Sequence, residues 1–250
     1  MSTRHDGRSY LITGATSGLG RAVAGHLTGE GARIWALGTT EAGVDAVVGA
    51  GAAIGGSACD ITDNDAVQRA VDAAVDALGK LDGGFVNAGI DGDGEPALTS
   101  SSSHFLRVLD VNIRGVFISA RCIAGHILAS QGTDTAGSIV INASVNGVRP
   151  EVNFASYNAS KAAAISLAQT FALEWAPRIA VTAVAPGYFP TRMTEPYLGD
   201  ADLADELLAH IPARRFGDPA ELGALVSYLL SPEAAYLTGG CINIDGGRHV

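Results

Sequence analysis

Cysteine is scarce in this sequence, which has three such residues, at positions 59, 122 and 241. They are widely separated and show no paired spacing of the kind that marks a disulfide framework. We therefore interpret Cys59, Cys122 and Cys241 as reduced, buried side chains, as is usual in a cytosolic protein.

The sequence also lacks the usual signs of a secretory leader or a membrane span. The first residues, Met1 to Ser9, contain no apolar core of a signal peptide. No apolar run approaches the length that a membrane-spanning helix requires. These absences predict a soluble protein of the cytoplasm.

Basic side chains are outnumbered by acidic ones. Lys and Arg total 16 and Asp and Glu total 26, which gives a formal net charge of −10. An acidic surface repels nucleic-acid phosphates and anionic lipids. The charge balance therefore argues against nucleic acid or membrane as the main partner. It leaves open a small-molecule substrate, which contacts only its own pocket.

The sequence offers no convincing metal site. Residues 91–95, Asp-Gly-Asp-Gly-Glu, begin like a calcium-binding loop. Pro96 stands where such a loop needs a glycine for its turn, and Ser102 stands where it needs a bidentate glutamate. We expect a solvated loop and no metal.

Apolar residues make up 47% of the sequence and charged residues 17%, as in a chain with a well-filled interior. β-prone segments alternate with segments of helical periodicity, without a repeat or a linker. This alternation predicts one α/β domain over residues 1–250, built on a doubly wound parallel sheet. We expect strands over 9–13, 33–37, 52–58, 81–86, 138–142, 179–184 and 241–244. We expect helices to about residue 28 and over 41–48, 65–78, about 101–129, 155–175 and 218–230, with a substrate lid over 188–211.

A glycine-rich turn follows the first predicted strand. Gly14, Gly18 and Gly20 punctuate the segment between Thr13 and the next helix. Strand, glycine turn and helix together direct backbone N–H groups and a helix N-terminus at a phosphate. A glycine loop alone could be an ordinary tight turn, but its place after the first strand favours a dinucleotide site.

The end of the second predicted strand bears on which dinucleotide binds. An acidic residue there would hold the ribose 2′-hydroxyl of NAD, and an arginine would neutralise the 2′-phosphate of NADP. The strand instead runs into Gly38, Thr39 and Thr40. These residues leave room for a phosphate and offer it hydroxyl donors, and no carboxylate is present to repel it. The sequence therefore favours NADP(H).

Further candidates follow the third, fourth and fifth strands. Asp60 could accept a hydrogen bond from an adenine amino group, or the segment could only cap the next helix through Thr62 or Asp63. The small residues of Asn87-Ala88-Gly89 would let a flat ligand approach the backbone. Ser144 follows the fifth strand. Because ligands of parallel α/β sheets bind beyond the carboxyl ends of the strands, we expect these residues to border one site.

Tyr157 and Lys161 lie four residues apart in a predicted helix, so both side chains project from one face. A lysine charge a few ångströms away would favour the tyrosinate and lower the tyrosine pKa by up to roughly three units. Taken alone, the pair could equally be an unremarkable surface feature. Asn112 interrupts the apolar face of the long predicted helix. It is either a structural hydrogen bonder or part of a site.

In order and spacing, these motifs resemble the short-chain dehydrogenase/reductase family in its classical form, over residues 8–247. Thr13-Gly14-x-x-x-Gly18-x-Gly20 is similar to the cofactor loop of the family, and Asn87-Ala88-Gly89 to its Asn-Asn-Ala-Gly turn, with Val86 replacing the first Asn. The catalytic pattern is matched by Asn112, by Ser144, and by Tyr157 with Lys161. Pro186-Gly187 and Thr191 match the loop on the nicotinamide side. The resemblance implies a Rossmann-type sheet of seven parallel strands in the order 3-2-1-4-5-6-7, with helices on both faces.

The resemblance also implies a role for each catalytic residue. Tyr157 would be the general acid that protonates a carbonyl oxygen during reduction, and the base during oxidation. Lys161 would lower the pKa of Tyr157 and hold the nicotinamide ribose. Ser144 would hydrogen-bond the substrate oxygen. Asn112 would bend its helix and support a water-mediated proton relay.

A dinucleotide would occupy the site in the same way as in the family. The loop glycines and the backbone of residues 16–19 would hold the pyrophosphate, Asp60 and Ile61 would flank the adenine, and Thr191 would bond the carboxamide. The full set that the resemblance implies for the cofactor is Gly14, Thr16, Ser17, Gly18, Leu19, Gly20, Gly38, Thr39, Thr40, Asp60, Ile61, Asn87, Ala88, Gly89, Tyr157, Lys161, Pro186, Gly187, Phe189 and Thr191.

The sequence departs from the family pattern where cofactor choice is made. NADP-using members often carry Arg at the position of Ser17 or Thr39, and NAD-using members usually carry Asp at the position of Gly38. This chain has neither. Its Gly-Thr-Thr turn resembles that of some NADPH-dependent 3-oxoacyl carrier-protein reductases, which agrees with the preference for NADP(H).

The expected function is oxidoreduction between a secondary alcohol and a ketone. One alternative is a 3-oxoacyl carrier-protein reductase, which would need basic docking residues such as Arg149, Arg192, Arg214 and Arg215, on a protein of net charge −10. A non-catalytic dinucleotide-binding regulator is also compatible with the fold, although the complete catalytic set argues against it. The resemblance further implies a homotetramer. Residues expected to line or border the substrate pocket are Val145, Asn146, Arg149, Glu151, Asn153, Tyr188 and Phe189.

Overall fold

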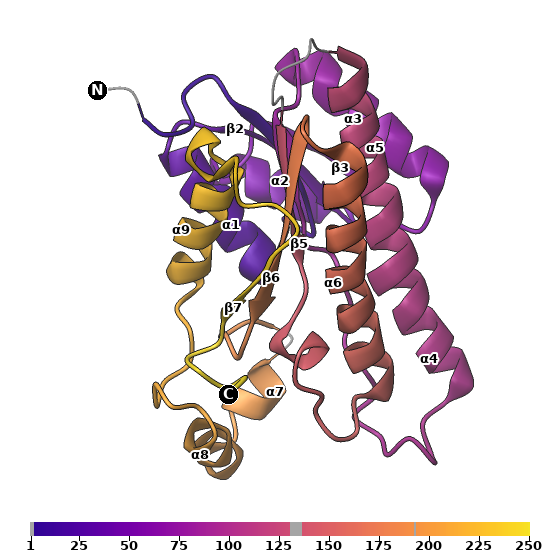
Figure 1. Ribbon diagram of the computed structural model, residues 1–250, viewed down its shortest axis with the longest axis vertical. Helices are drawn as coiled ribbons and strands as arrows, with labels where there is room; N and C mark the ends of the chain where they lie inside the picture. The colour runs from indigo at the N-terminus through magenta and orange to yellow at the C-terminus, as the bar shows by residue number, and fades with distance from the viewer. Residues whose placement is uncertain (1–2, 131–136, 193) are drawn as a thin grey trace.

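The computed structural model describes residues 3–130, 137–192 and 194–250, and it shows helices on both sides of a central parallel sheet (Figure 1). Within these residues the sheet has seven strands in the order β3-β2-β1-β4-β5-β6-β7. All neighbouring strands pair in parallel. The fold class and strand order expected from the sequence are confirmed. The strands are β1 (Ser9–Thr13), β2 (Arg33–Gly38), β3 (Gly55–Ala58), β4 (Gly83–Val86), β5 (Gly137–Asn142), β6 (Ile179–Pro186) and β7 (Cys241–Ile244).

The α-helices of the described residues connect the strands and cover both faces of the sheet. They are α1 (Gly18–Gly29), α2 (Glu41–Gly49), α3 (Asn64–Leu78), α4 (Ser102–Leu109), α5 (Val116–Ser130), α6 (Ala155–Trp175), α7 (Glu195–Leu198), α8 (Ala201–Ala209) and α9 (Pro219–Leu230). Single turns of other helix types are the π-helical η1 (Asp110–Gly115) and the 3-10 segments η2 (Val145–Gly147) and η3 (Pro232–Ala234). The segment expected to be a lid contains α7 and α8.

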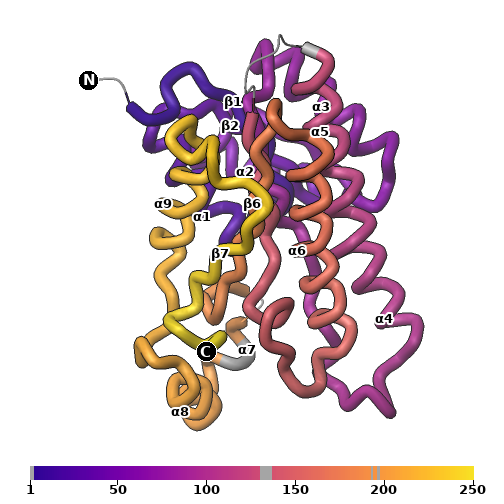
Figure 2. Tube along the Cα trace, in the orientation of Figure 1, coloured from indigo at the N-terminus to yellow at the C-terminus, as the bar shows by residue number. Residues whose placement is uncertain are grey.

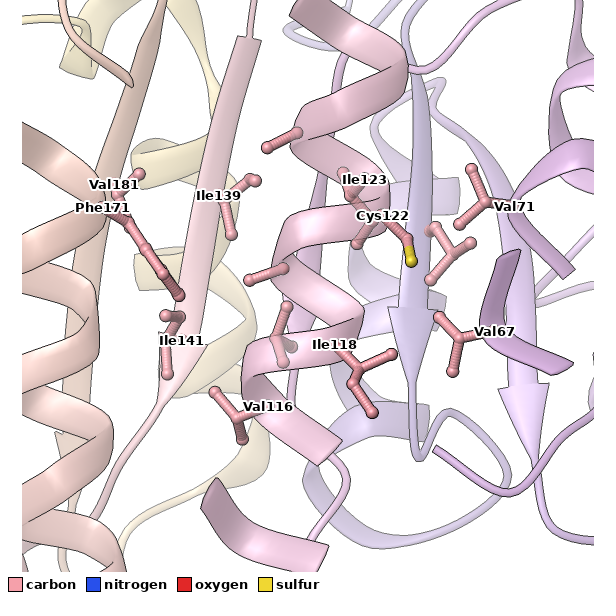
Figure 3. Close-up of a cluster of buried hydrophobic side chains, with 14 of the residues drawn as sticks. Val67, Val71, Val116, Ile118, Cys122, Ile123, Ile139, Ile141, Phe171 and Val181 are labelled. Atoms are coloured by element: carbon pink, nitrogen blue, oxygen red, sulfur yellow. The ribbon is translucent and has the colours of Figure 1, made fainter. Parts of the chain in front are cut away.

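Two apolar clusters hold the helices to the sheet. Successive side chains of a strand point to opposite faces, so Tyr10 and Ile12 of β1 enter one cluster with α1 and α9, while Leu11 enters the other. Figure 3 shows the second cluster, in which Val71 of α3 and Ile123 of α5 pack on the strands. Each face buries its own helices, and the sheet holds their ends in fixed positions.

Helix starts follow the capping residues that the sequence supplies. Asp63 accepts hydrogen bonds from the backbone N–H groups of Asp65 and Ala66 at the start of α3. Asp218 and Glu221 form a reciprocal capping box at the start of α9, with Pro219 in the first turn. Asp63, rather than Thr62, is therefore the cap of α3.

The long helix predicted over 101–129 is interrupted. Residues 110–115 form a π-helical turn between α4 and α5. Contrary to the sequence expectation, the stretch Ser102–Ala129 is long and apolar enough to cross a membrane, with a mean hydropathy of 1.2, but 56% of that window is buried inside the protein. Val116 and Ile127 belong to the core. We therefore interpret this stretch as a core helix of the domain.

The third strand is shorter than predicted. The prediction began it at Ala52, whereas β3 begins at Gly55. The backbone N–H of Ala52 donates to the carbonyl of Val47, which ties this residue to the end of α2. The chain therefore completes its helix cap before it can pair with β2.

Candidate active site

The carboxyl ends of the strands border a cleft of about 740 Å³, a volume in the usual range for small-molecule sites. Most of the predicted site residues line it together: Gly14, Thr16, Ser17, Gly18, Leu19, Gly38, Thr39, Asp60, Ile61, Asn87, Ala88, Gly89, Ser144, Tyr157, Lys161, Pro186, Gly187, Phe189 and Thr191. Other described residues of the lining, which the sequence did not predict as catalytic or cofactor-binding, are Leu37, Cys59, Thr62, Ile90, Arg107, Asp110, Val111, Asn142, Ala143, Arg192 and Thr194.

The glycine turn makes a close-packed cradle at one end of this cleft. Gly14 and Gly18 have φ of 63° and 51°, which non-glycine residues rarely adopt. A Cβ on Gly20 would lie 2.2 Å from the carbonyl oxygen of Gly14. Ser17, at the N-cap of α1, makes no side-chain capping bond. The first N–H groups of α1 are therefore free of a side-chain cap, as an anion site at a helix N-terminus requires.

Polar side chains fix the cradle to the neighbouring strand ends. The Thr13 hydroxyl accepts hydrogen bonds from the backbone N–H groups of Asn87 (2.8 Å) and Ala88 (3.0 Å). Asn87 Nδ2 donates to the carbonyls of Thr13 and Gly14. Its Oδ1 accepts from Asn142 Nδ2 at 2.8 Å. The ends of β1, β4 and β5 thus share one hydrogen-bonded unit.

Packing against Thr16 restricts which side chains fit at the end of β2. A Cβ on Gly38 would lie 2.3 Å from Thr16 Cγ2, so an acidic side chain at position 38 would displace Thr16. Thr40 lies outside the cleft lining and caps α2 by accepting from the N–H of Gly43. Thr39 lines the cleft. Of the two hydroxyls proposed for a phosphate, Thr39 is the one at the site, and Thr40 already serves the helix.

Asp60 lines the cleft, and its carboxylate also stabilises a turn in the chain. Its Oδ1 accepts from both the backbone N–H (2.9 Å) and the hydroxyl (2.8 Å) of Thr62. These bonds orient the carboxylate at the rim where Ile61 also lies. Because Asp63 performs the capping, Asp60 is not needed as the cap of α3.

Asn112 sits at the π-helical turn η1 and is 1% exposed. Its Oδ1 accepts from the backbone N–H of Ile90 at 2.8 Å, and its Nδ2 donates to the Ile90 carbonyl at 2.8 Å. Nδ2 also donates to Ser160 Oγ on α6 at 3.0 Å. A Cβ on Gly89 would lie 3.0 Å from Asn112 Oδ1. Asn112 therefore braces the segment after β4 against the helix that carries Tyr157.

Tyr157 and Lys161 lie in the first two turns of α6, and Lys161 Nζ is 5.5 Å from the centre of the Tyr157 ring. Lys161 is buried, and its Nζ donates to the backbone carbonyl of Asn142 at 2.9 Å. Ser144 follows β5 and accepts from the N–H of Asn146 at 3.1 Å. The phenol, the ammonium and the Ser144 hydroxyl all border the cleft.

Burial dominates the electrostatics of this pair. It raises the pKa of Tyr157 above its ordinary value, Asp91 and Glu151 add to the rise, and a hydrogen bond with Ser144 opposes it. Burial lowers the pKa of Lys161 to about 8, and Asp91 opposes that change. In the protein alone the Tyr157 pKa is therefore raised, whereas the spacing to Lys161 had suggested a lowered one, because removal from water favours the neutral phenol.

The residues predicted for the substrate side form a polar cluster next to the cleft lining. Tyr188 OH donates to Glu151 Oε1 at 2.6 Å, and Asn146 Nδ2 donates to Glu151 Oε2 at 3.2 Å. Arg248 Nη2 lies 3.2 Å from Glu151 Oε1. Arg248 was not among the predicted pocket residues, because no spacing in the sequence links position 248 to positions 151 and 188.

The remaining predicted pocket residues have other surroundings. Arg149 donates through Nη1 to the backbone carbonyls of Arg248 and Val250, so it holds the end of the chain. Val145 is buried, and Asn153 is exposed, with a φ of 67°. None of these three is among the described residues that line the cleft.

Comparison with known proteins agrees with this geometry. The family model described as enoyl-(acyl carrier protein) reductase matches residues 14–249. Levodione reductase of Leifsonia aquatica is 34% identical over 99% of this chain and 96% of its own length. A 3-oxoacyl-(acyl-carrier-protein) reductase of Thermotoga maritima is 34% identical over 98% of each chain. The crystal structure of NAD+-bound xylitol dehydrogenase has a TM-score of 0.91 and 32% identity, and the match covers 98% of this chain and 100% of that one. This chain belongs to the short-chain dehydrogenase/reductase family.

As a short-chain dehydrogenase/reductase, the protein is an NAD(P)(H)-dependent oxidoreductase that interconverts a secondary alcohol and a ketone. The described residues fit the dinucleotide of this family. The glycine cradle, where a Cβ would collide with backbone, and the α1 N-terminus without a side-chain cap suit a pyrophosphate. Asn142 Oδ1, at the same edge, is buried and has no hydrogen-bond partner among the described residues.

Two further features constrain partners of this short-chain dehydrogenase/reductase. Among the arginines predicted to dock a carrier protein, Arg215 forms a bidentate pair with Glu221. Of that set, Arg192 is the one that lines the cleft within the described residues. Across the ranges 3–130, 137–192 and 194–250, no group of three or more His, Cys, Asp or Glu residues could hold a metal ion. The three cysteines are free.

Proposed function

We propose that Tyr157 is the general acid and base of this oxidoreductase, with Ser144 and Lys161 as its partners. The observation that carries the proposal is that all three side chains border one cleft with the glycine cradle. During reduction the Tyr157 phenol donates its proton to the carbonyl oxygen, and during oxidation the phenolate accepts it from the alcohol. Ser144 Oγ, oriented by the N–H of Asn146, hydrogen-bonds the same oxygen.

Lys161 has a second task in this proposal. Its Nζ carries three N–H donors, of which one meets the Asn142 carbonyl. The others are directed to the ribose of the dinucleotide and to the proton path. The dinucleotide, when bound, supplies or accepts the hydride at the substrate carbon. Its positive charge in the oxidised form would favour the tyrosinate and offset the rise that burial causes in the Tyr157 pKa.

Asn112 supports the proton path as a positioning residue. The hydrogen bonds of its side chain go to Ile90 and Ser160. It holds the π-helical turn and the segment after β4 beside Lys161, where a water-mediated relay would run.

The dinucleotide is held by the residues predicted from the sequence, with the pyrophosphate on the glycine cradle, Asp60 and Ile61 beside the adenine, and Thr191 at the carboxamide. We favour NADP(H) over NAD(H), because no carboxylate stands at the end of β2 to repel a 2′-phosphate and Thr39 offers it a hydroxyl. Fluorescence titration with NADPH and NADH tests this choice. Tighter binding of NADH would contradict it.

The substrate is a small ketone or alcohol that enters between the lid segment 188–211 and η2. Asn146, Glu151 and Tyr188 give this side a polar character, which suits a hydroxylated or otherwise polar substrate. The decisive experiment is a panel of ketones with the reduced cofactors and of alcohols with the oxidised cofactors, followed by nicotinamide absorbance. Failure of every member to turn over, together with no binding of either dinucleotide, would contradict the proposed function.

A 3-oxoacyl carrier-protein reductase is the second candidate, favoured by the 34% identity to the Thermotoga maritima enzyme. It would require the acyl carrier to dock near Arg192, on a protein of net charge −10. A 3-oxoacyl thioester in the same panel separates the two candidates. Reduction of the thioester with a higher kcat/KM than that of every simple ketone would favour the carrier-protein reductase.

We further propose that the protein works in the cytoplasm as a homotetramer. A largely apolar groove runs over α4, η1, α5 and α6, and Leu106 and Leu173 are 64% and 84% exposed. Two copies of this face would bury each other's apolar side chains. Light scattering after size exclusion would give the mass of four chains, and Leu106→Glu combined with Phe117→Glu would reduce it. The groove is lined by Leu106, Arg107, Leu109, Asp110, Ile113, Arg114, Phe117 and Leu167.

A further inference from the structure

The C-terminal segment contributes a side chain to the substrate side of the molecule. Residues after β7 run to the end of the molecule that carries α7 and α8 (Figure 2). Arg248 lies four residues after the end of β7 at Ile244. Its side chain is 11% exposed, and the side chain of its partner Glu151 is 22% exposed. An arginine this well buried needs a charged partner and close packing.

Arg248 meets both requirements. Its Nη2 lies 3.2 Å from Glu151 Oε1, and its guanidinium lies over the Tyr188 ring, 5.0 Å from the ring centre. Arg149 Nη1 donates to the carbonyls of Arg248 and Val250, which holds the backbone in place behind the side chain. The planar guanidinium therefore packs on an aromatic ring and pairs with a carboxylate at once.

Glu151 connects Arg248 to residues that border the cleft lining. Its Oε1 also accepts from Tyr188 OH at 2.6 Å, and Tyr188 lies between Gly187 and Phe189, which both line the cleft. Its Oε2 accepts from Asn146 Nδ2 at 3.2 Å, and the Asn146 N–H donates to Ser144 Oγ at 3.1 Å. One carboxylate thus joins the serine of the site, the residue after Pro186-Gly187 and the C-terminal arginine.

We propose that Arg248 is a positioning residue for substrate binding, which acts through Glu151 on Tyr188 and on the Asn146–Ser144 turn. Removing the guanidinium leaves Glu151 with neutral donors only and frees the Tyr188 ring from its stacking partner. The substrate side then loosens, whereas the glycine cradle at the far end of the cleft keeps its geometry. This inference rests on the proposed oxidoreductase function.

The test uses Arg248→Met, which keeps the apolar stem, Arg248→Lys, which keeps the charge, and Glu151→Gln. Arg215→Met is the matched control, because it breaks an exposed Arg–Glu pair elsewhere. For each variant, KM and kcat are measured with the best substrate of the panel, and the dinucleotide Kd by fluorescence. We expect Arg248→Met to raise KM about tenfold, as for loss of a hydrogen bond to a charged group. Its kcat and dinucleotide Kd stay within about twofold of the wild type, Arg248→Lys recovers part of the change, and Arg215→Met has no effect.

The coupling between Arg248 and Glu151 allows a second experiment, a double-variant comparison, which can still be done if Arg248→Met folds poorly. Because both side chains act in one network, KM of Glu151→Gln/Arg248→Lys should be no higher than the larger of the single-variant values. An unchanged KM in the Arg248 variants, or an equal weakening of substrate and dinucleotide binding, would overturn the proposal and leave an ordinary structural contact. Wild-type protein that turns over no substrate and binds no dinucleotide would instead reject the proposed function, so the two failures are distinct.

Discussion

Lys161 Nζ donates a hydrogen bond to the backbone carbonyl of Asn142, 2.9 Å away. Helix α6 is thereby tied to the last residue of β5, two residues before Ser144. The ammonium is buried, and the nearby Asp91 carboxylate favours its charged form. The Asn142 carbonyl and Asp91 stabilise this charge, but burial outweighs them and lowers the Lys161 pKa, which has a measurable effect on stability.

Lys161 should make the free energy of unfolding depend on pH in the alkaline range. Burial lowers its folded pKa to about 8 from an ordinary value of 10.5. Between these values the unfolded chain binds more protons than the folded one, so the Lys161 contribution to stability rises with pH. Relative to Lys161→Met, the wild type should gain up to about 3 kcal/mol between pH 7.5 and 10.5. Urea unfolding of both proteins across this range measures the gain, and parallel pH profiles would refute the prediction.

Tyr157→Phe should abolish turnover without abolishing dinucleotide binding. The substitution removes the proton that the proposed mechanism transfers and leaves the ring in place. We expect kcat to fall by at least about 100-fold, as for loss of a general acid and base, with the dinucleotide Kd nearly unchanged. Tyr236→Phe is the control, because Tyr236 is fully exposed. Wild-type kcat in Tyr157→Phe would exclude the mechanism.

Gly20→Ala should damage the cofactor cradle. Its Cβ would lie 2.2 Å from the Gly14 carbonyl oxygen, so the turn must move. We expect the dinucleotide Kd to rise at least tenfold, a loss of about 1.4 kcal/mol. Gly25→Ala on the same helix is the matched control, since its Cβ meets nothing within 4 Å. That variant should bind normally and gain up to about 1 kcal/mol in stability from helix propensity. Equal Kd values for the two variants would count against the cradle.

His5 should sensitise the fold to acid. Its ring is fully buried, with Nδ1 2.9 Å from Tyr10 OH and Nε2 3.1 Å from Ser227 Oγ. Burial lowers the His5 pKa below its ordinary value of 6.5, against a rise from Glu30. Below pH 6.5 the unfolded chain therefore binds more protons than the folded one, and stability falls as the pH falls.

The measurement is the free energy of unfolding of wild type and His5→Gln between pH 7 and 5. The wild type should lose stability more steeply than His5→Gln over this range. His210→Gln, at an exposed position, should follow the wild-type profile. A His5→Gln profile that parallels the wild type would mean that His5 does not titrate on unfolding.

Sequence pattern was sufficient where local signals and burial agree. The bounds of β1, β7 and α6 were predicted at the residues where the structure has them. The motifs after the strands were correctly placed at one edge, because a parallel sheet brings all its carboxyl ends there. Neither result required knowledge of side-chain contacts.

The pattern failed where a distant contact decides the outcome. The π-helical turn at residues 110–115 follows hydrogen bonds between Asn112, Ile90 and Ser160, which no helical periodicity encodes. The pKa of Tyr157 depends on burial, which the spacing to Lys161 does not reveal. Arg248 meets Glu151 only because β7 closes the sheet next to β6. These are effects of tertiary structure, which patterns of neighbouring residues in the sequence do not predict.

The amide link between Asn87 and Asn142 has a direction as well as a shape. Asn87 Nδ2 donates to the carbonyls of Thr13 and Gly14, so Asn87 Oδ1 is the atom that faces Asn142. Asn142 therefore has to donate to it through Nδ2. Aspartate at position 142 would keep the outline of the side chain but set one acceptor against another. At this edge of the sheet, the direction of each hydrogen bond along the row of amides therefore limits which side chain fits position 142, a constraint that volume and hydropathy do not describe.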